Sequence, residues 1–200
     1  SYLKVQPFIA TLGMQQVVYG ICLVYTGGTP IGSLNSNFTA LAKDTLLAVP
    51  VLIWIALIVA ACFWFLYNKT RHGKYMYAIG GNPEAARLSG LRITRYKVAA
   101  YVIASLLAGL GGILLASRIG SSQVNAGGGY LMDAVAAAWI GFSLAGSGKP
   151  NALGTLVGAV ILGVLSNGLV MLSVPYYAMD IIKGLVLAGA LALTYFQRRT

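Results

Sequence analysis

The chain has 200 residues, of which 58% are hydrophobic and only 9% are charged, whereas soluble domains carry about 25% charged residues. A soluble protein of this length cannot bury so much apolar surface, so the composition excludes a soluble domain and predicts a membrane protein. The formal net charge of +10 would favour nucleic acid as a partner of a soluble protein. In a membrane protein, lysines and arginines gather in cytoplasmic loops, so we expect membrane lipid and no nucleic acid as a partner.

Three long apolar segments, at residues 46–67, 98–117 and 152–174, are predicted to span the membrane. The first of them has 22 residues and no charge. At about 1.5 Å per residue, a helix of this length crosses a hydrocarbon core of about 30 Å.

Three further apolar segments cover residues 5–25, 134–145 and 181–196. The first contains Pro7, Thr11, Gly13, Gln15 and Gln16, which favour a broken or buried helix shielded from lipid. The second reaches the length of a span only if it extends back to Tyr130. The third is followed by a glutamine and two arginines, which are typical of an anchor at the cytoplasmic interface. The six segments predict an all-α fold, a polytopic transmembrane helix bundle that forms a single transmembrane domain over residues 1–200.

The distribution of basic residues predicts the orientation. The loop at residues 69–97 carries seven of the fourteen lysines and arginines. If this loop is cytoplasmic, alternation across six segments places eleven basic residues inside and three outside, as the positive-inside rule favours. Both ends of the chain are then cytoplasmic. Because the first residue is Ser1 and not methionine, we expect the chain to be the C-terminal portion of a longer protein.

The connections differ in kind. Residues 27–43 and 118–129 are rich in glycine and small polar residues, which predicts external loops built of turns. Residues 146–151 predict a tight inner turn. Only the inner loop at residues 69–97 has a helix signature of its own.

Within that loop, residues 82–90 predict one short helix of about six residues with a stop at each end. Asn82 can accept a hydrogen bond as the N-cap, and Pro83 suits the first helical position because its missing N–H needs no partner there. Glu84 lies near the positive end of the helix dipole. Gly90 can adopt the left-handed conformation that ends a helix, with Leu91 folding back on the last turn. Such a helix is often only a connection; a docking element outside the bilayer is the alternative.

The stretch at residues 78–90, Ala-Ile-Gly-Gly-Asn-Pro-Glu-Ala-Ala-Arg-Leu-Ser-Gly, resembles a cytoplasmic loop of ATP-binding-cassette (ABC) importer permeases of the ribose–galactose–xylose branch. The family's Glu-Ala-Ala-x-x-x-Gly pattern is matched at Glu84, Ala85, Ala86 and Gly90. Residues 7–13 with 26–28, and residues 133–137 through 153–159, resemble the same branch. The similarity covers nearly the whole chain in order, and family members carry several more helices before this point.

This resemblance implies a non-catalytic permease subunit without a cofactor, in a bacterial (inner) membrane, that forms the path for a sugar or sugar-like solute. Its implied partners are a cytoplasmic ABC ATPase that binds the ATP, a periplasmic or extracellular sugar-binding protein, and a second permease subunit, identical or related. Residues 69–97 become the cytoplasmic coupling loop, and its short helix a coupling helix that inserts into a groove on the ATPase. The residues carried over to this role are Asn82, Pro83, Glu84, Ala85, Ala86, Arg87 and Gly90. An ion-coupled secondary transporter or channel without an ATPase is the alternative.

Polar side chains within the apolar segments are candidates for the substrate path, because an unpaired polar group in the membrane costs about 1–3 kcal/mol. Gln15, Gln16 and Asn167 are the candidates, and hydrogen bonding between helices is the other interpretation. Asp180 and Lys183 are three residues apart and are expected to pair on one helix face.

Small residues at spacings of four predict close helix packing in residues 152–174. Gly154 with Gly158, and Ala159 with Gly163, place small residues along one side of that helix, which would contact another helix of the same chain or a second subunit.

Several other kinds of site are excluded. Residues 145–150, Ala-Gly-Ser-Gly-Lys-Pro, lack the first glycine of a phosphate-binding loop and its final serine or threonine. His72 is the only histidine and the chain has four acidic residues, so we expect no metal site and no catalytic residue. Cys22 and Cys62 lack the spacing of a metal or redox motif.

Overall fold

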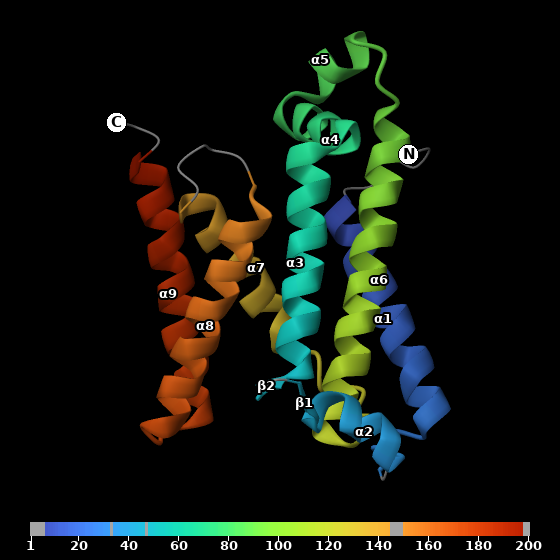
Figure 1. Ribbon diagram of the computed structural model, residues 1–200, viewed down its shortest axis with the longest axis vertical. Helices are drawn as coiled ribbons and strands as arrows, with labels where there is room; N and C mark the ends of the chain where they lie inside the picture. Colours follow the sequence, from blue (N-terminus) through green and yellow to red (C-terminus); the bar gives the residue numbers. More distant parts are fainter. Residues whose placement is uncertain (1–6, 33, 47, 145–149, 198–200) are drawn as a thin grey trace. The chain divides into compact units, whose positions relative to one another are not determined.

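The computed structural model describes residues 7–32, 34–46, 48–144 and 150–197, and this part of the chain is mostly helical. A two-stranded antiparallel hairpin, β1 (Thr45–Leu46) and β2 (Val49–Pro50), is the only regular strand pair there. The chain forms two compact units, one of residues 1–57 and 78–128 and the other of residues 58–77 and 129–200. We call these the first unit and the second unit (Figure 1).

Nine helices lie within the described residues. The first unit contains α1 (Pro7–Thr26), α2 (Ser36–Lys43), α5 (Pro83–Leu88) and α6 (Ile93–Ile119). The second unit contains α7 (Tyr130–Leu144), α8 (Ala152–Met171) and α9 (Tyr176–Gln197). Two helices, α3 (Val51–Lys69) and α4 (Arg71–Gly81), contribute residues to both units.

Four helices, α1, α3, α6 and α8, are long and apolar enough to cross a membrane, and α7 is a shorter apolar helix. The segments predicted at 46–67, 98–117 and 152–174 correspond to α3, α6 and α8. The segment predicted at residues 134–145 does extend back to Tyr130, where α7 begins. The helix α6 begins at Ile93, before the predicted start of its span at residue 98. The described residues therefore agree with a multi-pass helical membrane protein.

The helix α1 differs from one of the two sequence-based alternatives, that of a broken segment. It is continuous from Pro7 to Thr26, and none of the described residues in its membrane-length window is buried. Pro7 is its first residue, where the missing N–H has no helical acceptor, so the proline begins the helix without breaking it. The alternative of a broken helix was wrong because it counted the proline as a breaker without regard to its position; that neighbouring helices shield α1 from lipid stays a prediction.

The loop at residues 27–43 holds a helix, α2, that the sequence analysis missed. The side chain of Asn35 caps it by accepting a hydrogen bond from the Asn37 amide. The fully buried Ser117 near the end of α6 donates a 2.6 Å hydrogen bond to the carbonyl of Phe38, so α2 lies against that end of α6 (Figure 1). The signal in the sequence was Asn35 followed by an apolar helical stretch.

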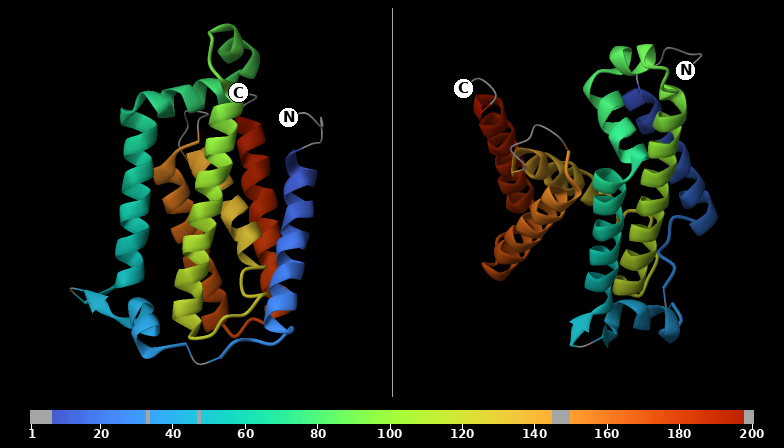
Figure 2. Two further views of the ribbon diagram at one scale, coloured as in Figure 1. Left: turned by 90° about the vertical axis from the view of Figure 1, so that its right-hand side faces the viewer. Right: turned by 45° about the horizontal axis from the view of Figure 1, so that its top comes forward.

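A sharp corner joins α3 to α4, as the left view of Figure 2 shows. The Thr70 hydroxyl donates to the carbonyl of Leu66 at 2.5 Å and accepts from the Gly73 amide at 3.2 Å. A Cβ atom on the buried Gly73 would collide with the backbone of Leu66 and Tyr67. Only glycine therefore fits at this corner, which sets the direction in which α4 leaves the preceding helix.

In the second unit, α7 and α8 approach each other through small residues. A Cβ on Gly154 would collide with the Gly141 backbone, and one on Gly158 would collide with the Ala137 backbone. A Cβ on Gly163 would meet no described atom within 4 Å. Two of the three glycines singled out in the sequence thus lie in contact with α7 of the same chain.

Candidate functional site

The candidate site is the helix α5 with the loop around it. The Asn82 side chain accepts a 3.1 Å hydrogen bond from the Ala85 amide, and Pro83 occupies the first turn together with Glu84. This satisfies one of the amides that a helix N-terminus leaves unpaired. The six-residue length and the cap at Asn82 are as the sequence predicts.

The other end of α5 is closed by two backbone hydrogen bonds. Gly90 has φ +78°, its amide bonds to the carbonyl of Arg87 at 3.0 Å, and the amide of Leu91 bonds to the carbonyl of Ala86 at 3.1 Å. This pair of bonds is the Schellman arrangement, and it confirms the predicted left-handed stop at Gly90. The helix α5 is therefore a short element with a hydrogen-bonded cap at each end.

The side chains of α5 divide into an inner and an outer face. Ala86 is 4% exposed, and α5 contacts α6. Glu84, Ala85 and Arg87 are exposed. Leu88 follows Ala86 by two residues, which corresponds to about 200° around a helix, so it points away from Ala86. Its side chain is accordingly 89% exposed. The sequence analysis did not single out Leu88, although its spacing from the alanine carried that signal.

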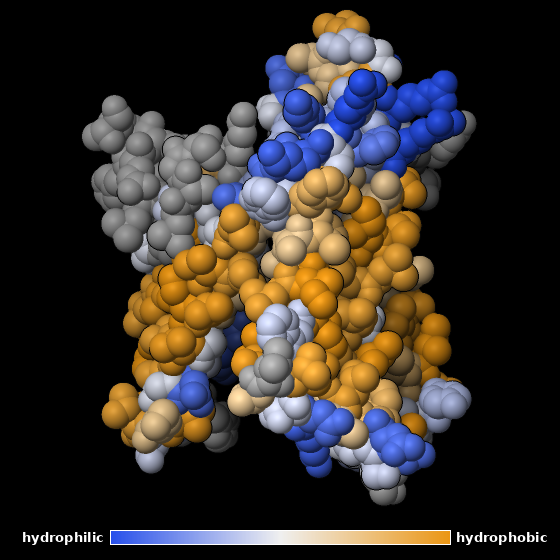
Figure 3. All heavy atoms as spheres, viewed as in Figure 1, coloured by the Kyte–Doolittle hydropathy of each residue, from blue (hydrophilic) through white to orange (hydrophobic). Residues whose placement is uncertain are grey.

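Exposed basic side chains surround α5. Figure 3 shows hydrophilic atoms gathered around α4 and the start of α6, next to α5, and hydrophobic atoms over the middle of α6. All seven lysines and arginines of residues 69–97 are exposed. Lys4, Lys149, Arg198 and Arg199, which the orientation argument also uses, lie outside the described residues, as does most of the predicted inner turn at 146–151.

A long-range hydrogen bond ties α4 to the start of α8, within the second unit. The Tyr77 hydroxyl donates to the carbonyl of Pro150 at 2.6 Å, and the Tyr77 ring lies 5.6 Å from that of Tyr67. Burial, and to a lesser degree the neighbouring Tyr67, raise the pKa of Tyr77, so its hydroxyl keeps its proton. Asn151 then caps α8 by accepting from the Leu153 amide at 3.2 Å. The helix that leads into α5 is thus connected to a long apolar helix.

The candidate path residues are exposed on their helices. Gln15 and Gln16 lie on α1 in the first unit, and Asn167 lies on α8 in the second unit.

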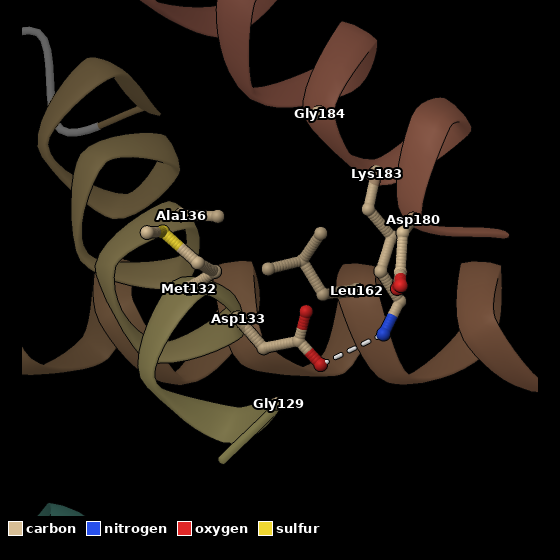
Figure 4. A pocket seen from close by; sticks show the side chains of 8 residues that line it. All are labelled: Gly129, Met132, Asp133, Ala136, Leu162, Asp180, Lys183 and Gly184. Carbon is tan, nitrogen blue, oxygen red and sulfur yellow. Dashed lines mark hydrogen bonds and ion pairs between the residues drawn. The ribbon is translucent and has the colours of Figure 1, made fainter. Parts of the chain in front are cut away.

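The expected pairing of Lys183 with Asp180 was wrong. The Lys183 ammonium instead pairs with Asp133 of α7 at 2.9 Å, and the two side chains are 25% and 26% exposed (Figure 4). The pair forms one wall of a pocket of about 300 Å³ between α7, α8 and α9, with Asp180 beside it. Sequence spacing reveals neighbours on one helix only, so a partner on another helix could not be found that way. Among the described residues, no cluster of three or more His, Cys, Asp or Glu side chains is suited to hold a metal ion.

Over residues 1–191, the chain matches the family described as "Branched-chain amino acid transport system / permease component". It is 42% identical over 191 residues to the ribose import permease protein RbsC of Escherichia coli (strain K12). The aligned region covers 92% of this chain and 59% of that protein. It is 41% identical to RbsC of Bacillus subtilis (strain 168), covering 95% of this chain and 60% of that protein. It is 38% identical over 200 residues to the galactose/methyl galactoside import permease protein MglC of Haemophilus influenzae (strain ATCC 51907 / DSM 11121 / KW20 / Rd). That aligned region covers 96% of this chain and 60% of the relative.

The chain spans about three fifths of the length of these curated relatives. No solved structure matches it significantly. The family match covers almost all of the chain, and the identities hold over nearly the same residues. The chain therefore belongs to the permease-component family of ABC importers, whose members are membrane subunits without a catalytic centre or a cofactor.

Proposed function

We propose that the protein forms the translocation path of an ABC importer for a sugar or sugar-like solute, driven by a separate ATPase. The substrate class follows the relatives, whose names specify ribose and galactose or methyl galactoside. Gln15, Gln16 and Asn167 are the proposed path residues, because amide groups exchange hydrogen bonds with a neutral solute without a charge to hold it back.

The proposed topology has six membrane segments, corresponding to α1, α3, α6, α7, α8 and α9, in a bacterial (inner) membrane. It places the loop at residues 69–97 and both ends of the chain in the cytoplasm. The supporting observation is the uneven distribution of lysines and arginines. The exposure of all seven basic side chains of this loop is consistent with a position at the membrane surface.

The observation that carries the proposal is α5, an exposed helix closed at both ends within a basic loop. We assign docking on the ATPase to Asn82, Pro83, Glu84, Ala85, Ala86, Arg87 and Gly90, and we add Leu88. The small, exposed Ala85 lets a partner surface approach closely, Glu84 and Arg87 offer one charge of each sign, and Leu88 offers an apolar contact. Ala86 is buried on the inner face, so its part is to let α5 lie close to α6. A rigid helix transmits a displacement, whereas an uncapped turn would absorb it.

The further partners in this proposal are a periplasmic or extracellular sugar-binding protein and a second permease subunit. Movement of α5 would pass through α4 to the Tyr77–Pro150 hydrogen bond and so to the start of α8. In this way a cytoplasmic closure of the ATPase would reach the apolar helices that line the path.

The test is a membrane pull-down of the full-length protein, co-expressed with the ABC ATPase of the same cell, comparing wild type with Glu84→Lys. Asp44→Lys is the matched control, because it makes the same charge change at the exposed end of α2. We expect retention of the ATPase by wild type and control, and loss by Glu84→Lys. Folded, inserted protein that retains no ATPase in any version would contradict the proposal and favour an ion-coupled carrier or channel.

A further inference from the structure

A second polar site lies in the second unit, between α7, α8 and α9 (Figure 4). Its charged groups are Asp133 from α7 and Asp180 and Lys183 from α9. Leu162 of α8 and Ala136 of α7 are both buried and supply an apolar wall. The pocket measures about 300 Å³, which is at the lower end of the range for small-molecule sites.

Asp133, Asp180 and Lys183 are charged residues on helices that are otherwise apolar, which calls for a physical explanation. The helices around them are apolar, and α8 alone has a mean hydropathy of 2.0 over its 20 residues. Ionisable groups within membrane segments are costly and are placed there for ion or substrate handling far more often than in soluble proteins. The ion pair joins α7 to α9, whereas the contact between α7 and α8 is made by small residues.

The pocket holds a third charged group, Asp180, in addition to the ion pair between Asp133 and Lys183. The Lys183 ammonium donates to Asp133 at 2.9 Å, and Asp180 adds a second, exposed carboxylate that lines the same pocket. The pocket thus offers two carboxylates that accept hydrogen bonds and one ammonium with three N–H groups, one of which is donated to Asp133. Leu162 and Ala136, which line the same pocket, offer carbon atoms only.

We propose that this pocket binds a monosaccharide. The carboxylates of Asp133 and Asp180 accept hydrogen bonds from neighbouring sugar hydroxyls, and the ammonium of Lys183 donates to a hydroxyl or to the ring oxygen. The C–H face of the sugar packs on Leu162 and Ala136. A polyhydroxylated, uncharged ring matches this division, since its rim is polar and its faces are apolar. The assignment rests on the function proposed above and names a binding site for its substrate class.

The site also has a place along the path in the proposed topology. Asp133 is three residues into α7, and Lys183 is seven residues into α9. At about 1.5 Å per residue these positions lie about 5 and 11 Å from the helix starts. Both helices begin on the external side in that topology, so the pocket would receive the solute soon after it enters the membrane.

The experiment is saturation-transfer NMR with D-ribose and with D-galactose on the purified full-length protein in lipid nanodiscs. Asp180→Asn removes one charge and leaves the Asp133–Lys183 pair intact. Asp44→Asn makes the same change on α2 and is the control. We expect saturation transfer to wild type and control, and at least about a tenfold weaker affinity in Asp180→Asn, because a hydrogen bond to a charged group is lost.

A charge swap separates binding from packing. Asp133→Lys combined with Lys183→Asp restores the ion pair between α7 and α9 but exchanges its donor and acceptor positions. We expect the swap to recover the amount of folded protein lost in either single variant, and not to recover sugar binding. Full binding by the swap or by Asp180→Asn would overturn the proposal.

The same preparations distinguish this proposal from the function on which it rests. No saturation transfer to wild type, in a preparation that still retains its ATPase, would refute the pocket assignment and leave the importer assignment standing. Loss of ATPase retention by wild type would remove the importer assignment itself.

Discussion

The helix α5 and the α7–α8 pair are held in place by different kinds of contact. The bonds that begin and end α5 all come from residues 82–91. The α7–α8 pair depends on two separate helices, whose backbones meet where Ala137 and Gly141 lie against Gly158 and Gly154. Caps form wherever the local sequence allows them, whereas a helix crossing requires both surfaces to fit at once. Damage to α5 should therefore be local and functional, and damage to the crossing should be structural.

The largest effect is expected at the crossing. Gly158→Leu forces a side chain into the Ala137 backbone, and we expect a loss of about 3 kcal/mol, the upper end of the range for overpacking. The measurement is the yield and thermal stability of detergent-solubilised protein. Gly163→Leu is the matched control on the same helix, because a Cβ there meets no described atom within 4 Å. Equal stability of the two variants would contradict the α7–α8 crossing.

A smaller effect is expected at the end of α5. Gly90 has φ +78°, a conformation that costs a side-chain-bearing residue about 1–2 kcal/mol. Gly90→Val should therefore weaken binding of the ATPase about tenfold, without reducing the yield of folded protein. Titration of the ATPase against membranes provides the measurement. Gly80→Val, in the helix α4 and with no neighbour within 4 Å of its Cβ, should behave like wild type, and a normal Gly90→Val would argue against docking through α5.

The smallest effect is expected at the hydrogen bond between Tyr77 and Pro150, which connects α4, the helix before α5, to the start of α8. Tyr77→Phe removes the hydrogen bond to Pro150, which is worth about 0.5–1.5 kcal/mol. We expect normal retention of the ATPase with slower sugar uptake, because α5 is intact and its link to α8 is weakened. Tyr101→Phe, an exposed tyrosine on α6, serves as control. Unchanged uptake in Tyr77→Phe would show that coupling does not pass through this bond.

The same bond has a pH dependence of known sign. Burial raises the pKa of Tyr77 above its ordinary value, so the protonated hydroxyl is favoured in the folded protein. Its contribution to stability is complete below about pH 10, the ordinary tyrosine pKa, and is lost as the pH rises through the raised value. The Tyr77→Phe variant should lack this dependence.

The length of the apolar segments and the two ends of α5 were predictable from sequence, because both depend only on residues that are close together in the chain. A 22-residue run without charge leaves few alternatives to a membrane helix, and Asn82, Pro83 and Gly90 act only on the turn next to them. Where the reasoning ignored position or capping it went wrong: Pro7 begins α1 and does not break it, and Asn35 caps a helix in a loop expected to hold only turns.

The sequence by itself determined the membrane class, the order of the apolar helices and the two ends of α5, since these depend on composition and on bonds within a few residues. Only the tertiary structure decided that Lys183 pairs with Asp133 and not with Asp180, that Tyr77 reaches Pro150, and that Gly154 and Gly158 contact α7 while Gly163 does not. Each of these contacts joins residues on different elements. Spacing along one helix says which side chains share a face, but the residue opposite that face is set by how the helices pack.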